Sequence, residues 1–264
     1  MPLSLNLESV SAGTVGLASQ RDCFYTFGNA ERNTAAALEN YVLRDMASQR
    51  SSVVIGCRES FVAVHLSKFF PTVFAVEENA AFLSEVIVRQ PRIVGCQIEP
   101  DDFKISEPTD LVLVAHLMQS LGNWLETPEE RNHQRLAFLN HYYGALAENG
   151  AVVLLRNRPQ NNYRRVMEYI SVAPSDELQV LYGQINQQFA PEYYLFPVEI
   201  NTQNAEDMVL ALSYLMNNDD LNGTGDPSGK TAHLRTYAQT LQNLDGNYYF
   251  NYEGELVVFR KRTA

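Results

Sequence analysis

The sequence predicts an α/β fold built on a mostly parallel sheet, and three observations lead to this expectation. Short apolar runs alternate with segments of helical periodicity between residues 51 and 172. These runs, of which LVLVA at 111–115 is the clearest, are apolar throughout, as in strands that helices cover on both faces. The β-rich runs 247–252 and 255–261 flank Glu253-Gly254, and they predict a C-terminal antiparallel hairpin.

Local signals fix the expected order of the elements. Residues 1–18 are small and polar and predict a loose arm, whereas residues 20–46 have helical apolar spacing that the polar stretch GNAERN interrupts. Gly150 is expected to end a long helix in a left-handed turn. Strands are expected at 53–55, 72–76, 93–96, 111–115 and 151–155, and helices at 60–69, 79–89, 128–147, 161–172, 205–216 and 231–241, with an aromatic, extended segment at 192–201.

The composition argues against several classes of protein. The 264 residues are 45% hydrophobic, which is enough for a packed α/β core. The chain has no long apolar run and its first segment, MPLSLNLESV, lacks signal-peptide features, so we expect no membrane span and a cytoplasmic location. The net charge of −11 repels nucleic-acid backbones. Scattered cysteines and histidines predict neither a disulfide framework nor a metal site.

The segment from Val53 to Glu77 has the layout of half a nucleotide-binding unit. A β-branched strand stops at Gly56, a helical segment follows, and the next strand ends at Glu77, 21 residues after the glycine. In such a unit the glycine lets the backbone approach the ligand, and the acid at the second strand's tip holds both hydroxyls of a ribose. The sequence therefore predicts an adenosine-containing cofactor, with Cys57 and Arg58 in the turn that meets it.

Further stretches extend this pattern in order along the chain. They are VVIGC at 53–57, Asp101-Asp102-Phe103, DLVLVAHLMQSL at 110–121 and LAENGAVVLL at 146–155. Together with Glu77 they resemble the motifs of class I S-adenosylmethionine-dependent methyltransferases. The resemblance implies a seven-stranded Rossmann-like sheet, S-adenosylmethionine as cofactor, and methyl transfer. It also implies an N-terminal arm and helical cap at 1–50, and a cofactor-binding domain at 51–264 whose insertion around 186–245 covers the substrate.

Within this family the layout is most similar to that of small-molecule N-methyltransferases of the histamine N-methyltransferase kind. The similarity lies in the aromatic segment FYTFGNAERN, the region after the fourth strand and the terminal FN-containing run. It implies a small-molecule acceptor, an amine or another nitrogen or oxygen nucleophile. It places Gly56, Cys57, Arg58, Glu77, Asp101, Asp102, Phe103 and His116 against the cofactor, and Phe27, Asn33, Gln119, Trp124 and Tyr193 against the acceptor, with His116 and Tyr25 as the catalytic groups.

Several of these residues also suit ordinary structural roles. Glu77 suits the first turn of a helix, where a carboxylate meets the positive end of the dipole. Cys57 suits a buried packing position, and His116 suits a hydrogen-bonded buried site. The aromatic cluster at 189–196 suits a pocket wall or a dimer face. The turn has only one glycine, and Arg58 stands where the family usually has a small residue, so it either crowds or pairs with the cofactor's carboxylate.

Two other functions stay open at the level of sequence. Relatives of this fold transfer the aminocarboxypropyl group of S-adenosylmethionine or cyclise it, and a turn with one glycine and an arginine leaves room for that chemistry. A chain of this fold can also serve as a non-catalytic binding protein. A nicotinamide dehydrogenase is disfavoured, because its turn needs several glycines to meet a pyrophosphate. The sequence gives no sign of the oligomeric state.

Overall fold

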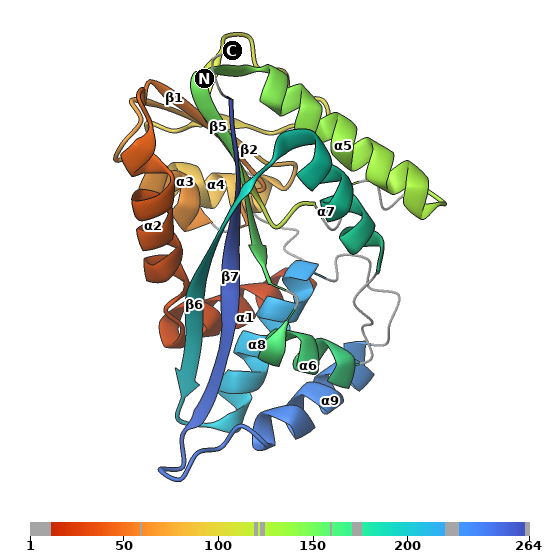
Figure 1. Ribbon diagram of the computed structural model, residues 1–264. Coiled ribbons are helices and arrows are strands. Elements are labelled where there is room, and N and C mark those ends of the chain that lie inside the picture. The colour runs from red at the N-terminus through yellow and green to blue at the C-terminus, as the bar shows by residue number, and fades with distance from the viewer. Residues whose placement is uncertain are drawn as a thin grey trace.

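The fold is seen in a computed structural model that describes residues 12–58, 60–118, 121, 125–158, 160–170, 176–219 and 227–261. At its centre lies a seven-stranded sheet in the order β3-β2-β1-β4-β5-β7-β6 (Figure 1). Strands β1 to β5 are parallel, and β7 is antiparallel to both β5 and β6. The strands are β1 (Ser51–Ile55), β2 (Thr72–Val76), β3 (Val94–Cys96), β4 (Thr109–Ala115), β5 (Leu146–Asn157), β6 (Glu192–Thr202) and β7 (Tyr248–Arg260).

Helices cover both faces of the sheet, and each face has its own apolar cluster. Two helices, α5 and α7, pack on one face, and the other helices contribute to the cluster on the opposite face. The helices are α1 (Ala12–Phe27), α2 (Ala30–Tyr41), the short 3-10 helix η1 (Leu43–Asp45), α3 (Ser60–Leu66), α4 (Ala80–Arg89), α5 (Pro128–Gly144), α6 (Asn161–Tyr169), α7 (Asp176–Phe189), α8 (Ala205–Asp219) and α9 (Pro227–Gln239). The alternation expected from β1 to α6 is confirmed.

The N-terminal cap differs from expectation at its start and agrees at its break. Helix α1 already begins at Ala12, so the arm expected over 1–18 is helical from that residue onward. The break in GNAERN falls at Gly28 and Asn29, because their backbone bonds to the edge strand β6. Asn29 donates its N–H to the Glu199 carbonyl at 3.1 Å, and its side chain accepts the Glu199 N–H at 2.8 Å.

The end of the long helix was predicted incorrectly. Helix α5 stops at Gly144, and β5 begins at Leu146, earlier than the expected 151. The left-handed residue is Asn149, with φ of 63°, and not Gly150. Gly150 is required for a different reason, since a Cβ there would lie 2.9 Å from the Asp110 carbonyl oxygen. The glycine therefore serves close packing of β5 against β4.

The C-terminal antiparallel pair is present, but Glu253-Gly254 is not its turn. Strand β7 runs without a break through Gly254, which pairs with Phe196 of β6. The ring of Phe196 lies over the glycine, where an added Cβ would approach it to 2.3 Å. Sequence reading mistook this packing glycine for a turn glycine. It also missed α7, whose weakly apolar stretch contains Gly183 and four glutamines.

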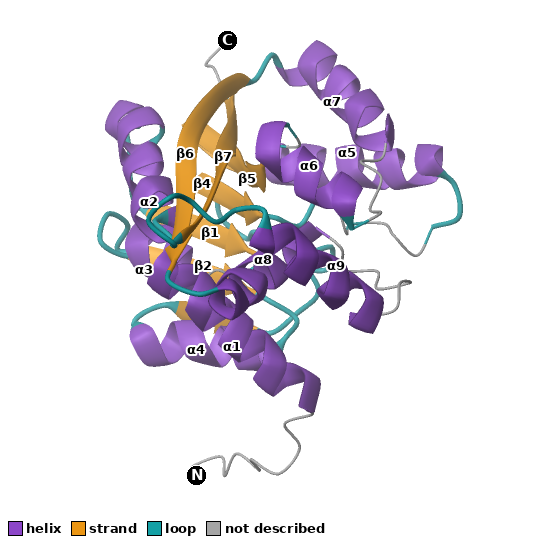
Figure 2. Ribbon diagram, turned by 90° about the horizontal axis from the view of Figure 1, so that it is seen from below, coloured by secondary structure: helices purple, strands orange, loops and turns teal. Residues whose placement is uncertain are grey.

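The carboxyl ends of the parallel strands face a group of helices at one end of the molecule. Viewed along that direction, α1, α8, α6 and α9 lie in front of the tips of β1, β4 and β5 (Figure 2). Helices α8 and α9 belong to the segment expected as a substrate-covering insertion. None of the helices that the structure describes is long and apolar enough to cross a membrane.

Candidate functional site

The turn after β1 lies where the strand order of the sheet reverses. Strand β1 has β2 on one side and β4 on the other, and such a switch point is where open α/β sheets bind ligands. Gly56 has φ of 80°, and its N–H donates to the Val76 carbonyl at 3.1 Å. A Cβ on Gly56 would lie 2.8 Å from the Ala115 carbonyl oxygen. Only glycine therefore lets this turn lie between the tips of β2 and β4.

Glu77 holds this turn from the tip of β2. Its Oε2 accepts the Cys57 N–H at 2.8 Å and its Oε1 accepts the Asn79 N–H at 2.9 Å, and the residue is only 8% exposed. Burial raises the pKa of Glu77 above its ordinary value, against the opposing effect of these two bonds and of Arg58. Helix α4 starts only at Ala80, with Asn79 as its N-cap, so Glu77 precedes the helix instead of sitting in its first turn.

Cys57 and Arg58 have different places in the turn. Cys57 is fully buried, with its thiol 3.8 Å from the Val54 carbonyl oxygen, and burial raises the pKa of that thiol. Its side chain packs, and its backbone N–H is the part that reaches Glu77. The guanidinium carbon of Arg58 lies 4.9 Å from the centre of the Tyr214 ring, a cation–π arrangement. The arginine is thus directed toward α8.

Tyr214 is a component of the site that sequence reading missed. It is fully buried on α8, and its ring lies 5.8 Å from that of Tyr25 and 5.2 Å from that of Phe24 on α1. Tyr25 and Arg58 therefore meet through one ring, and α1 and α8 join above the turn after β1. A possible signal was a single tyrosine in the largely apolar run VLALSYLM.

His116 directly follows Ala115, the last residue of β4, whose carbonyl oxygen lies close to Gly56. Its φ is 52°, a left-handed conformation uncommon outside glycine. Its N–H donates to the Leu155 carbonyl at 2.9 Å, which ties the tip of β4 to that of β5. The fold therefore imposes an unfavourable backbone conformation at the switch point. Such outliers are concentrated at functional sites.

The acidic turn after β3 lies at the same edge of the sheet. Asp101 and Asp102 are exposed, and Asp101 accepts a hydrogen bond from Gln134 of α5 at 3.0 Å. Phe103 is half-buried, with its ring 6.4 Å from that of Phe74 on β2. Phe103 therefore packs in the apolar cluster on the face of the sheet that α5 and α7 cover. The carboxylates of Asp101 and Asp102 remain exposed to solvent.

The residues expected around the acceptor do not all gather at this edge. Phe27 packs in the core at the end of α1, and Asn33 donates to the Pro197 carbonyl at 2.8 Å. Tyr193 is on the edge strand β6, and the strands β4, β5 and β7 separate it from the turn after β1. Gln119 and Trp124 lie outside the described residues.

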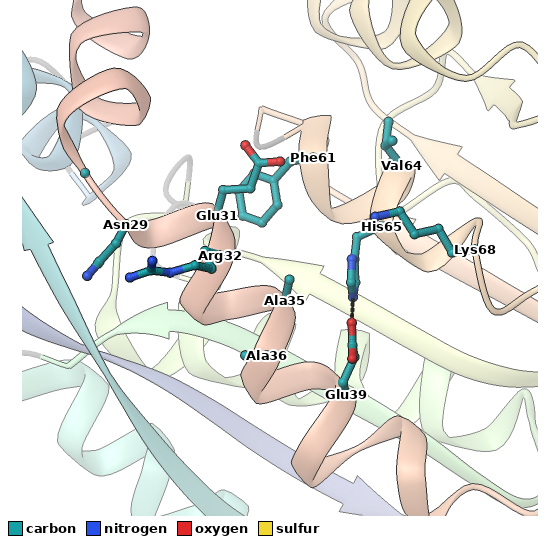
Figure 3. Close-up of a pocket in the computed structure, with 11 residues that line it drawn as sticks. Asn29, Glu31, Arg32, Ala35, Ala36, Glu39, Phe61, Val64, His65 and Lys68 are labelled. Atoms are coloured by element: carbon teal, nitrogen blue, oxygen red, sulfur yellow. Dashed lines mark ion pairs between the residues drawn. The ribbon is translucent and has the colours of Figure 1, made fainter.

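Two hollows border the cap. One, of about 390 Å³, adjoins Tyr25 and Ser60 near the turn after β1, and Arg21 and Glu85 form an ion pair at its wall. The other, of about 570 Å³, is a groove between α2 and α3 (Figure 3). There the His65 Nε2 lies 3.2 Å from the Glu39 Oε1, and burial lowers the pKa of this histidine. Among the described residues, no group of acids, histidines and cysteines could hold a metal ion.

No protein-family model and no curated protein sequence matches this chain. Solved structures do match. A protein from Anaeromyxobacter dehalogenans described as a type II methyltransferase superposes with a TM-score of 0.55 and 13% identity, over 88% of this chain and 98% of that one. YcgJ from Bacillus subtilis gives 0.52 and 11%, over 94% and 99%. The plantazolicin methyltransferase BpumL, in complex with S-adenosylhomocysteine, gives 0.50 and 12%, over 96% and 92%. The chain has the class I methyltransferase fold.

Proposed function

We propose that this chain binds S-adenosylmethionine at the turn around Gly56 and transfers its methyl group to a small molecule. The observation that carries the proposal is Glu77, a buried carboxylate at the tip of β2 beside the switch point. Its two oxygens each accept one backbone N–H, and each keeps a further lone pair for a ligand hydroxyl. The fold and the S-adenosylhomocysteine bound by BpumL support the same assignment.

The residues around the turn suit the parts of this cofactor. Glu77 would accept the ribose hydroxyls. Arg58, directed along Tyr214, would pair with the carboxylate of the methionine end. Asp101 and Asp102 are available to the amino group of the adenine, and Phe103 would lie on the apolar side of the purine. In this arrangement Arg58 pairs with the cofactor instead of crowding it.

The chemistry asks little acid–base help from the protein. The bound cofactor supplies a methyl group on a sulfonium, which is already activated. The chain's task is to align the nucleophile and to exclude water, and α1 and α8 above the turn provide the cover. A protonated amine must lose its proton before it attacks. The imidazole of His116 is proposed as the group that takes this proton, and Tyr25 as a group that orients the acceptor.

Calorimetry and product analysis test the proposal. The chain is titrated with S-adenosylmethionine and with S-adenosylhomocysteine. It is then incubated with S-adenosylmethionine and a panel of primary amines and phenols, and the nucleoside product is identified by mass. Binding followed by S-adenosylhomocysteine formation supports methyl transfer. Methylthioadenosine would indicate aminocarboxypropyl transfer or cyclisation instead, and absence of binding would overturn the proposal.

Two conservative variants test the catalytic roles. Tyr25→Phe and His116→Asn should leave the melting temperature and S-adenosylhomocysteine affinity nearly unchanged, while at least one lowers turnover tenfold or more. His141→Asn, on the exposed side of α5, is the matched control. Parental turnover in both variants would remove these residues from the mechanism.

A further inference from the structure

Two enclosed polar groups beside the strand tips have no partner within the part of the chain that the structure describes. They are the Nδ2 of Asn157 and the hydroxyl of Tyr163. Asn157 is 4% exposed and Tyr163 is 0% exposed. Buried donors are nearly always hydrogen-bonded, so each exception needs an explanation. An unoccupied binding function is one such explanation, because a ligand then completes the missing bonds.

The two groups lie close to one another in the fold. Asn157 is the last residue of β5 and pairs with Gly254 of β7. Tyr163 comes from α6, and its ring centre lies 5.8 Å from that of Tyr252. Side chains two residues apart on a strand share a face, so Tyr252 is on the same face of β7 as Gly254. Asn157 and Tyr163 thus approach the same stretch of β7 from two different elements.

The face of β7 that carries Tyr252 is aromatic, and the neighbouring strand residues contribute no charge to it. The ring of Phe196 covers Gly254, and Phe250 lies 6.1 Å from Tyr252 between ring centres. Arg156 alternates to the opposite face, where its guanidinium carbon lies 3.5 Å from the centre of the Tyr182 ring on α7. Two neutral hydrogen-bonding groups therefore stand among flat apolar surfaces.

The same face leads directly to the candidate active site. Leu155, two residues before Asn157 and on its face, accepts the N–H of His116 through its carbonyl. In the strand order, β5 is next to β4, on the side away from β2 and Glu77. The tip of β5 therefore lies beside the tip of β4. A molecule held by Asn157 would lie past His116, where an acceptor has to approach the methyl group.

We propose that Asn157 and Tyr163 bind the acceptor substrate, and that the part of the acceptor they contact is uncharged and planar and has a hydrogen-bond-accepting oxygen or nitrogen. The inference rests on the function proposed above. Planarity suits the aromatic walls, neutrality suits a face without a charged partner, and the accepting atom suits the donors of a carboxamide and a phenol. Both donors are enclosed in this structure, so the acceptor reaches them when the covering helices separate locally.

A matched pair of probes tests the class of ligand. Acetophenone and ethylbenzene share a ring and a similar shape, but only acetophenone has a carbonyl oxygen. Binding to the full chain is followed by ligand-observed nuclear magnetic resonance. Acetophenone should bind at least tenfold more tightly, and Asn157→Leu and Tyr163→Phe should reduce the preference to less than threefold. Tyr169→Phe is the control, because this tyrosine is on the same helix and 43% exposed. Equal or absent binding of both probes to the parent would overturn the proposal.

Stability separates a binding role from an ordinary structural one. If the two groups await a ligand, Asn157→Leu and Tyr163→Phe should melt at or above the parent's temperature, since each removes an unpaired buried donor. A clear fall in melting temperature for Tyr163→Phe would show that its hydroxyl has a structural partner such as a buried water, and would also overturn the proposal. Titration with S-adenosylhomocysteine distinguishes the two proposals. Its failure to bind the parent refutes the function, whereas the probes decide the subsite independently.

Discussion

Two buried carboxylates hold the two ends of β1, and their pKa values are shifted in opposite directions. At the amino end, Asp110 accepts the N–H of Arg50 at 2.6 Å and of Ser51 at 3.2 Å, and the Arg50 guanidinium lies 3.4 Å away. Burial raises the pKa of Asp110, but these bonds and the charge of Arg50 outweigh it, and the pKa is lowered overall. At the carboxyl end, burial prevails at Glu77 and the pKa is raised.

The difference separates a structural carboxylate from one suited to a ligand. Asp110 has its charge compensated within the chain, so it gains little from a further partner. Glu77 has two backbone bonds and the charge of Arg58 to offset its burial, and burial still prevails, so ligand hydroxyls would improve its environment. Both residues accept two backbone N–H groups, and hydrogen-bond geometry alone would not tell them apart. The balance between burial and compensation does.

The largest effect is expected from removing the carboxylate at the amino end. Asp110→Ala leaves two partly buried backbone N–H groups without an acceptor, which should lower the free energy of unfolding by about 3 kcal/mol. The affinity for S-adenosylhomocysteine should stay within about threefold of the parent. Urea denaturation and calorimetry measure both, with Asp245→Ala as an exposed control outside the site. A loss of affinity without a loss of stability would reverse the roles assigned to the two ends.

At the carboxyl end of β1, a substitution should reduce ligand affinity more than it reduces stability. Glu77→Gln keeps the shape but loses the charge that strengthens bonds to the ribose hydroxyls. Its dissociation constant for S-adenosylhomocysteine should rise about 10- to 100-fold, equivalent to roughly 1.4–2.8 kcal/mol, with a smaller loss of stability than in Asp110→Ala. Glu78→Gln, the exposed neighbour, is the matched control. Unchanged affinity in Glu77→Gln would disprove the ribose assignment.

A smaller and more selective effect is expected at Arg58. Arg58→Met keeps an unbranched side chain against Tyr214 and removes the charge. Affinity for S-adenosylhomocysteine should fall about fivefold, roughly 1 kcal/mol, because the carboxylate loses its partner. Methylthioadenosine lacks that carboxylate, and its affinity should not change. Arg92→Met provides an exposed control. An equal fall for both ligands would place Arg58 elsewhere in the site.

The smallest effect is in the pH dependence of stability, where the two carboxylates should have opposite signs. The lowered pKa of Asp110 stabilises the fold above the ordinary aspartate value, and that contribution is lost as the pH falls through the folded-state value. The raised pKa of Glu77 makes the folded chain bind more protons than the unfolded one, so its contribution improves as the pH falls toward the ordinary glutamate value. Denaturation of the parent, Asp110→Asn and Glu77→Gln between about pH 7 and 3 tests this. Parallel curves would contradict it.

The sequence alone determined the fold class and the position of the glycine turn after the first strand. The strand at 53–55, Gly56 and the acid at 77 are local features, because a strand, a tight turn and a strand tip depend mainly on neighbouring residues. The break in GNAERN and the α/β alternation could be predicted for the same reason. Glu77 was therefore placed at the tip of the second strand before any tertiary contact was known.

The tertiary structure decided everything that depends on residues distant in sequence. It gave Gly254 a ring to pack against instead of a turn to make, and Gly150 a carbonyl to approach instead of a helix to end. It brought Tyr214 of α8 to Arg58 and Tyr25, and it left Tyr193 on the edge strand, with three strands between it and the turn after β1. Periodicity shows which face of a helix or strand is apolar, but which partner that face meets is set by the packing of the whole chain.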